Sequence, residues 1–428
     1  MTNNLPRRQP CDAGSGYACF MPPRPPSHVM QYLDTVAAVA AFAREIASAP
    51  SIALDTEGAS FHRFVDRVYL MQLSTRTATA IVDPLPTGDL AALKPLVESP
   101  DIEIVFHDAD YDLRLLRQDY SWATRHIFDT RIAAQLLGYK AFGLAALLEQ
   151  HFGIALDKKF QRADWSLRPL SEGMLQYASQ DTMYLLALRD ILHGELVAKG
   201  RLGWAAEEFA RLEQTQWSAE DSSQIYLKVK GARDLKRREL AVLRELVPWR
   251  DAVAKELDRS TFRVVSNDVL LEICRVQPTT RQALGVIKGM PRGVLDQRGD
   301  LVLACVARAM DLPEADLPKF PKAARWEKDP EFDDRAARLR AVRDEVATKL
   351  ELDPGVLCSR EKLETIARRL PTSIEELYET PDLRHWQADL LGPGILRALT
   401  AAPAATAPAS VTPSPVTASA PSDSPYRD

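Results

Sequence analysis

Three short segments carry carboxylates at spacings that could hold metal ions. The first is Asp55-Thr56-Glu57, at the end of the apolar run Ser51-Ile52-Ala53-Leu54. Side chains alternate along a strand, so Asp55 and Glu57 are expected to point to the same face. Two neighbouring carboxylates repel each other, and a cation between them removes that cost. A polar strand end is the alternative interpretation.

The other two segments add further oxygen ligands. Asp112 ends the run His107-Asp108-Ala109-Asp110-Tyr111-Asp112, which follows a predicted buried strand; an aspartate in such a place can also cap the next helix. Tyr177 and Asp181 lie four residues apart in a stretch with helical periodicity, so they share one helix face. A hydrogen-bonded core pair of tyrosine and aspartate is the alternative there.

Jointly, four carboxylates on three segments fit two divalent cations about 3.5–4 Å apart. Mg²⁺ and Mn²⁺ prefer hard oxygen ligands and usually keep water or substrate phosphate as further ligands. One ion would lower the pKa of a bound water and aim it at phosphorus, while the other would stabilise charge on the leaving 3′ oxygen. A nearby tyrosine hydroxyl could orient the water. The combination predicts metal-dependent cleavage of a phosphodiester.

The order of these motifs resembles the DEDD exonucleases of the tyrosine subclass, and more closely the ribonuclease D family. Asp112 lies in an HxxxxDL context, and Gln176 occupies the position where the histidine subclass has its histidine. The resemblance covers residues 31–203. Supporting motifs in family order are Phe128-Asp129-Thr130, Ala163-Asp164-Trp165-Ser166, Arg168-Pro169-Leu170 and Tyr177-Ala178.

The resemblance implies a ribonuclease-H-like α/β fold and removal of nucleotides one at a time from an RNA 3′ end, leaving 5′-monophosphates. Carried over by residue, Asp55, Glu57 and Asp181 would bind one ion, Asp55 and Asp112 would hold the other, and Tyr177 would position the water. Residues 58–63 depart from the family, because many relatives have Phe directly after the Glu of the first motif. Substrate fit near the terminal nucleotide depends on that loop.

The elements that must position these residues alternate in type. Helices are predicted at 36–46, capped by Asp34 or Thr35, at 90–97, at 113–117, after 128–130 and at 172–192. Strands are predicted at 51–54, 67–74, 77–82 and 102–106. Hairpin-like strands followed by alternation with helices predict a mixed sheet flanked by helices.

The second half of the chain lacks strand patterns. Residues 235–312 and 334–399 show helical periodicity broken by Pro and Gly, and resemble each other weakly, which predicts two small all-α bundles. They resemble HRDC domains, which are named for helicases and ribonuclease D. The predicted organisation is a disordered extension (1–28), the exonuclease domain (29–218), a first HRDC domain (228–315), a linker (316–332), a second HRDC-like domain (333–400) and a disordered Ala/Pro/Ser/Thr tail (401–428).

Composition limits the class of protein. The 428 residues carry 54 Lys and Arg against 59 Asp and Glu, a net charge of −5, which excludes a basic protein that coats nucleic acid. Five cysteines without a CxxC pair argue against a disulfide framework or a zinc finger. The first residues lack the apolar core of a secretory signal, and no run is long enough for a membrane span. We therefore expect a cytoplasmic protein without a membrane partner.

Positive charge gathers locally. Residues 228–259 hold ten positive and six negative side chains, among them Arg237 and Arg238, which could bind phosphate or form a solvated helix face. In the nuclease half, Lys159 and Gln161 are of types that bind RNA. Trp165 and Arg168 could also bind RNA, or could brace the helix that carries Asp181. His107 is a candidate of the same kind, or a satisfied histidine at a strand end.

The sequence thus predicts a 3′-to-5′ exoribonuclease with two Mg²⁺ or Mn²⁺ ions, acting on tRNA precursors and other small structured RNAs with a free 3′ end. Two alternatives stay open: a DNA exonuclease of the same fold, and an RNA-binding scaffold whose nuclease site is silent. Protein partners are not predicted.

Overall fold

The computed structural model describes residues 30–218, 223–321 and 329–401; the predicted terminal extensions lie outside these ranges, apart from Ala401. The first range forms one six-stranded sheet in the order β1-β4-β3-β2-β5-β6. Its strands are β1 (Met30–Leu33), β2 (Ser51–Glu57), β3 (Leu70–Ser74), β4 (Thr79–Val82), β5 (Glu103–Phe106) and β6 (Ile127–Asp129). β3 is antiparallel to β2 and β4, and the other pairs are parallel. The predicted mixed sheet is confirmed.

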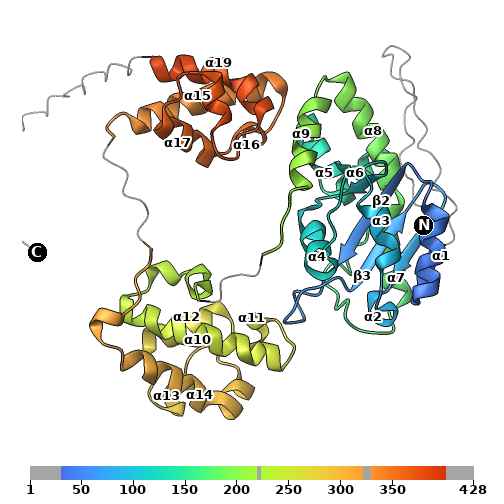
Figure 1. Cartoon of the computed structure of the whole chain (residues 1–428). Coiled ribbons are helices and arrows are strands. Elements are labelled where there is room, and N and C mark those ends of the chain that lie inside the picture. The colour runs from blue at the N-terminus through green and yellow to red at the C-terminus, as the bar shows by residue number, and fades with distance from the viewer. Residues whose placement is uncertain (1–29, 219–222, 322–328, 402–428) are drawn as a thin grey trace, which may run out of the picture. The chain divides into compact units, whose positions relative to one another are not determined.

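Helices cover both faces of this sheet (Figure 1). The helices of the first range are α1 (Val36–Ile46), α2 (Pro84–Thr87), α3 (Lys94–Val97), α4 (Asp110–Tyr120), α5 (Thr130–Leu137), α6 (Leu144–Phe152), α7 (Glu172–Met183), α8 (Leu185–Ala198) and α9 (Leu202–Leu212). Thr35, one of the two predicted caps, accepts a hydrogen bond from the Ala38 amide and begins α1. Within this range, α7 packs on β2, β3 and β4.

Alternation along the strands separates two cores. Leu54, Met71 and Leu73 face α1 and α4 in the larger core, whereas Leu70 and Ile81 face α7 together with Ala178. Because Asp55 and Glu57 alternate with Leu54, they face the α7 side. Strand alternation therefore brings the first motif and the helix of the third motif to one face of the sheet.

Several predicted boundaries differ from the structure. β1 and β6 were not predicted, because three or four residues carry too little periodicity and both strands are held by pairing with distant strands. The helix predicted at 90–97 is a turn of 3₁₀-helix at Ala91–Leu93 followed by α3. The stretch 172–192 is two helices, α7 and α8, that meet at Tyr184.

The first helical region comprises α10 (Arg237–Glu256), α11 (Thr261–Val264), α12 (Asn267–Val276), α13 (Arg281–Gly285) and α14 (Arg292–Met310). Short 3₁₀ turns, η2 (Ile225–Lys228), η3 (Ala232–Asp234) and η4 (Glu314–Asp316), flank these helices. α10 packs against α12 and α14 around a core of aliphatic side chains and two cysteines, Cys274 and Cys305. Both thiols are buried and free.

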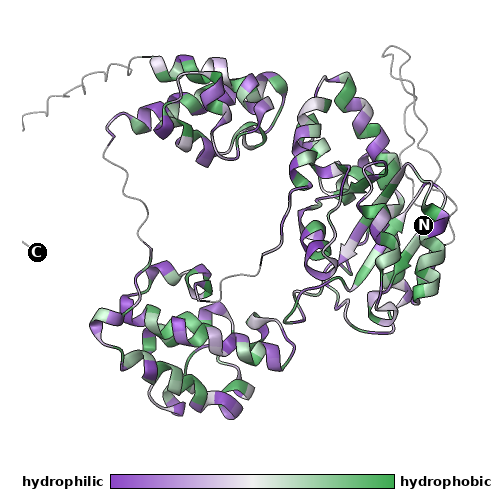
Figure 2. Cartoon of the chain, in the orientation of Figure 1, coloured by the Kyte–Doolittle hydropathy of each residue, from purple (hydrophilic) through white to green (hydrophobic). Residues whose placement is uncertain are grey.

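The second helical region repeats this order. It comprises α15 (Phe332–Leu350), α16 (Pro354–Leu357), α17 (Arg360–Arg369), α18 (Ile374–Tyr378) and α19 (His385–Thr400). The five helices have 19, 4, 10, 5 and 16 residues, against 20, 4, 10, 5 and 19 in the first region. Figure 2 shows hydrophobic and hydrophilic residues alternating along these amphipathic helices. The predicted internal repeat is confirmed by these lengths.

The fold class is therefore as predicted, an α/β sheet region followed by two small helical regions. Among the described helices, none is both long and apolar enough to cross a membrane.

Candidate active site

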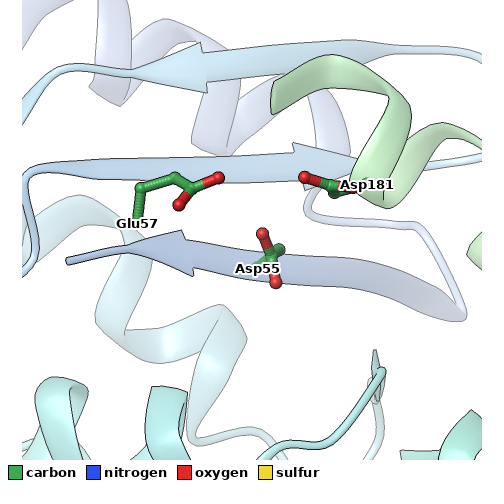
Figure 3. Close-up of side chains that lie close together, drawn as sticks. All are labelled: Asp55, Glu57 and Asp181. Carbon is green, nitrogen blue, oxygen red and sulfur yellow. The ribbon is translucent and has the colours of Figure 1, made fainter. Parts of the chain in front are cut away.

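Three carboxylates lie together on the α7 side of the sheet. Asp55 and Glu57 come from the last residues of β2, and Asp181 comes from α7 (Figure 3). One carboxylate oxygen of each lies within 4.8 Å of the others, and each side chain is partly exposed. Hard oxygens at this separation suit a divalent cation such as Mg²⁺ or Mn²⁺. These residues fit the metal that the sequence predicts.

Asp112 approaches the end of β2 from α4 and is held there by Thr56. Its Oδ1 accepts a hydrogen bond of 2.9 Å from the Thr56 amide and one of 2.6 Å from the Thr56 hydroxyl. The carboxylate is 5% exposed and lies close enough to Asp55 for the two charges to repel. The alternative interpretation, that one aspartate of this run caps the helix, is wrong, because the N-cap of α4 is Ala109 and no side chain caps it by a hydrogen bond.

Burial and mutual repulsion raise the pKa of all four carboxyl groups. Burial is the larger cause at Asp55, followed by the charge of Asp181. Burial again leads at Glu57 and at Asp112, followed in both by the charge of Asp55. At Asp181, burial and then the charge of Asp112 raise the pKa to about 7. Such a cluster is costly to ionise alone, and a bound cation would offset that cost.

Tyr177 lies one helical turn before Asp181 on α7. Its ring packs against Phe160, with centroids 6.2 Å apart, and against Trp165, with centroids 6.1 Å apart. Burial, followed by the charge of Asp181, raises the pKa of the phenol. The hydroxyl therefore stays protonated and able to donate a hydrogen bond beside the carboxylates.

Trp165 and Arg168 lie in the segment that precedes α7. Trp165 is 1% exposed, so its indole belongs to the core under Tyr177. The guanidinium of Arg168 uses all five N–H groups. Nε and Nη2 bind the two oxygens of the fully buried Asp83, while the other bonds go to the carbonyls of Tyr69, Trp165 and Leu167. These contacts favour the bracing role over direct binding of RNA.

Asp83 and its second partner, Tyr32, were missed by the sequence analysis. The Tyr32 hydroxyl donates to Oδ2 of Asp83, so the carboxylate joins the ends of β1 and β4 to the segment before α7. The sequence Val82-Asp83-Pro84 offered a weak indication, since it places a carboxylate directly after an apolar strand.

The loop after Glu57 is fixed by a second pair that the sequence analysis missed. The hydroxyl of Tyr111 donates to Oδ2 of Asp66 at 2.6 Å, and Oδ1 of Asp66 accepts from the Ala59 amide at 2.9 Å. A Cβ on Gly58 would lie 2.0 Å from the Tyr111 oxygen. Glycine at this position therefore allows Tyr111 to cross the loop, close to Asp112 and Glu57.

His107 is nine-tenths buried, and its Nδ1 lies 2.9 Å from the Thr130 hydroxyl. Burial, assisted by the charge of Arg131, lowers the pKa of His107 to about 4. The imidazole is therefore neutral near pH 7, which favours a satisfied histidine that supports the sheet end.

The remaining candidates lie apart from the carboxylates in the chain. Lys159 and Gln161 are exposed between α6 and α7, with the Lys159 ammonium 5.2 Å from the centroid of the Phe160 ring. Arg237 and Arg238 begin α10. Arg237 donates to the carbonyls of Glu314 and Leu317, and Arg238 donates to three carbonyls at the end of α14 and just beyond it. Several N–H groups of these two guanidinium groups are therefore already used in hydrogen bonds within the first helical region.

Comparison with known proteins agrees with this geometry. A family model described as 3′-5′ exonuclease matches residues 30–197, and the HRDC domain model matches residues 239–306 and 332–399. The domain boundaries that the sequence predicts stay a prediction.

Among similar proteins is ribonuclease D of Granulibacter bethesdensis, 29% identical over 84% of this chain and 89% of that protein. Ribonuclease D of Escherichia coli is 30% identical over 68% of this chain and 77% of that protein. The crystal structure of Escherichia coli RNase D, an exoribonuclease involved in structured RNA processing, superposes with a TM-score of 0.68 at 26% identity. That match covers 87% of this chain and 98% of the other.

Exonucleases of this fold depend on a divalent metal, and three acidic side chains lie close enough together to hold one. The ribonuclease D relatives and the HRDC matches indicate that the substrate is RNA. The sequence motifs, the sheet, the acidic cluster and the comparisons agree. The chain belongs to the ribonuclease D family and is a 3′-to-5′ exoribonuclease.

Proposed function

We propose that this protein removes nucleotides from RNA 3′ ends by a two-metal mechanism at Asp55, Glu57, Asp112 and Asp181. The observation that carries the proposal is the approach of the Asp55, Glu57 and Asp181 oxygens to within 4.8 Å of one another. Asp55, Glu57 and Asp181 would hold one ion, and Asp55 with Asp112 would hold the other. Bound Mg²⁺ or Mn²⁺ would supply a water of lowered pKa and stabilise charge on the leaving 3′ oxygen.

The chain's own residues orient the reaction. Thr56 fixes Asp112 through two hydrogen bonds, so that carboxylate is oriented before any ion binds. The Tyr177 ring packs against two other aromatic rings, and its protonated hydroxyl would donate to the attacking water. Exposed Lys159 and Gln161 are proposed to contact the RNA, while Trp165, Arg168 and His107 support the elements around the site.

We propose tRNA precursors and other small structured RNAs as substrates, in the cytoplasm. Support comes from the two helical regions after the nuclease, which match HRDC domains, and from the similar Escherichia coli enzyme, an exoribonuclease involved in structured RNA processing. The local positive charge between residues 228 and 259 would add salt-dependent phosphate binding, although Arg237 and Arg238 themselves serve the fold.

The test uses the full-length chain with 3′-labelled single-stranded RNA, single-stranded DNA and a tRNA precursor. Each substrate is incubated with Mg²⁺, Mn²⁺ or EDTA, and released nucleotides are separated by chromatography. Release of 5′-mononucleotides from the RNAs, abolished by EDTA, is expected. Preference for DNA would support the DNA exonuclease, and binding without cleavage would support the silent scaffold.

Asp55→Asn tests the metal assignment because Asp55 is proposed to touch both ions. Loss of metal stabilisation worth several kcal/mol should lower the rate by about three orders of magnitude, with RNA affinity largely retained. Asp101→Asn, which removes a charge from an exposed loop, serves as the control and should keep wild-type activity. Near-normal hydrolysis by Asp55→Asn would refute the two-metal site.

A further inference from the structure

Gln72 lies in the middle of β3, directly beside the first acidic motif. In the antiparallel register, Gln72 pairs with Asp55 of β2 on one side and with Ile81 of β4 on the other. Residues paired across strands point to the same face. The Gln72 side chain therefore shares with Asp55 the face of the sheet that α7 covers.

The amide of Gln72 is buried and unsatisfied. The residue is 0% exposed, and within the described residues neither Nε2 nor Oε1 has a hydrogen-bond partner. Buried amides are nearly always hydrogen-bonded, because stripping water from them without replacement costs free energy. A buried primary amide with both atoms unpaired is therefore an exception that calls for a partner.

The neighbours of Gln72 limit what that partner can be. Leu70 and Ile81, on the same face, are apolar. Ser74, two residues further along β3, is already paired with Thr79 at 3.0 Å and with Thr182 of α7 at 2.8 Å. The register sets Asp55, a polar residue, directly beside Gln72 on the same face of the sheet.

We infer that Gln72 is a positioning residue for the metal site, whose amide N–H donates to the Asp55 carboxylate when that carboxylate holds a cation. The inference rests on the proposed function. An ionised carboxylate has about four acceptor positions, so Asp55 can bind two cations and still accept a hydrogen bond. Partners of this kind orient metal ligands, and their loss typically weakens metal binding by 10–100-fold.

The competing explanation is structural. A buried water could satisfy Gln72 whether or not metal is present, as buried waters do for other internal polar groups. The two explanations differ in the metal-free protein. If the amide gains its partner only with the cation, replacing it by an apolar side chain costs no stability in EDTA. If a permanent water satisfies it, the replacement destabilises the protein in EDTA and in Mn²⁺ alike.

The experiment compares full-length wild type with Gln72→Met, which keeps the length of the side chain and removes both polar atoms. Mn²⁺ affinity is measured by titration calorimetry, and the unfolding midpoint by scanning calorimetry in EDTA. We expect Mn²⁺ affinity to fall about tenfold, with a midpoint in EDTA equal to or above that of wild type. Gln72→Leu is the second variant if Gln72→Met does not fold.

Ser74→Ala is the matched control, because Ser74 lies on the same strand and face but has protein partners. It should lower the midpoint in EDTA and leave Mn²⁺ affinity unchanged. Two results would overturn the inference. One is unchanged Mn²⁺ affinity in Gln72→Met, and the other is an unfolding midpoint of Gln72→Met in EDTA that falls as far as that of Ser74→Ala. If wild type itself binds no Mn²⁺, or Asp181→Asn binds it normally, the proposed metal site fails instead.

Discussion

Removing the charge of Asp181 should stabilise the metal-free protein at neutral pH while destroying the metal site. In the folded chain, burial and then the Asp112 charge raise the pKa of Asp181 to about 7, from an ordinary value of 3.8. Between these two values the folded state holds a proton that the unfolded state has released. Stability is therefore present in acid and is lost as the pH rises through this window.

The size of the effect follows from the width of the window. Each pH unit in which only the folded state is protonated costs about 1.4 kcal/mol, so the rise from pH 5 to about pH 7 costs about 3 kcal/mol. Asp181 is partly exposed, and solvent screening reduces this figure to about 2 kcal/mol. Asp181→Asn removes that cost. For a domain of this size, the gain corresponds to a midpoint roughly 4–8 °C higher.

The assay is scanning calorimetry of the full-length chain in EDTA at pH 5 and pH 8, following the transition that Mn²⁺ shifts in wild type. The advantage of Asp181→Asn over wild type should be larger at pH 8 than at pH 5. Saturating Mn²⁺ should reverse the order, because Asp181→Asn loses the ion that Asp55, Glu57 and Asp181 would share and therefore gains less stability from binding. Asp101→Asn, in an exposed loop, should show neither effect.

An equal difference between Asp181→Asn and wild type at both pH values would show that Asp181 is not held protonated in the folded state. A variant less stable than wild type in EDTA at pH 8 would refute the reasoning altogether. In that case the carboxylate would make favourable contacts that outweigh burial and repulsion.

Three further predictions concern residues that surround the carboxylates. Tyr177→Phe removes the hydroxyl proposed to orient water, and should slow single-turnover hydrolysis about 10²-fold with Mn²⁺ affinity unchanged; an unchanged rate would remove that role. Arg168→Met leaves Asp83 buried without its cation and should cost about 3–5 kcal/mol in urea unfolding; a loss below about 1 kcal/mol would contradict the bracing role. Gly58→Ala places a Cβ 2.0 Å from the Tyr111 oxygen, so it should displace Tyr111 and raise KM for RNA. The double variant Gly58→Ala/Tyr111→Phe should then lose no more than Gly58→Ala, and additive losses would argue against the clash.

Local periodicity explains why much of the site was predictable. Asp55 and Glu57 share a face because strand side chains alternate, and Tyr177 and Asp181 share a face because a helix repeats every 3.6 residues. Both relations depend only on the backbone within a few residues. The order of the motifs then identified the family, and the two helical regions followed from their periodicity alone.

The tertiary structure decided what depends on contacts between distant segments. Asp112 belongs to a run of aspartates of which one could have capped the helix. The fold instead bonds Asp112 to Thr56 of β2, close to Asp55. From the sequence, Trp165 and Arg168 could bind RNA or brace α7. The fold buries the Trp165 indole and surrounds the Arg168 guanidinium with hydrogen-bond acceptors. Arg237 and Arg238 look like phosphate ligands in the sequence but bind carbonyls around the end of α14.

Gln72 is the clearest case. In the sequence, Gln72 is a polar residue within an apolar strand. The sequence indicates neither its hydrogen-bond partner nor the face of the sheet on which it lies. Only the strand register sets it opposite Asp55, and only the packing of α7 removes water from its amide. The sequence by itself determined which side chains could do chemistry, because that depends on residue type and local spacing. The fold determined which of them meet, because burial and register are set by pairing between segments far apart in the chain.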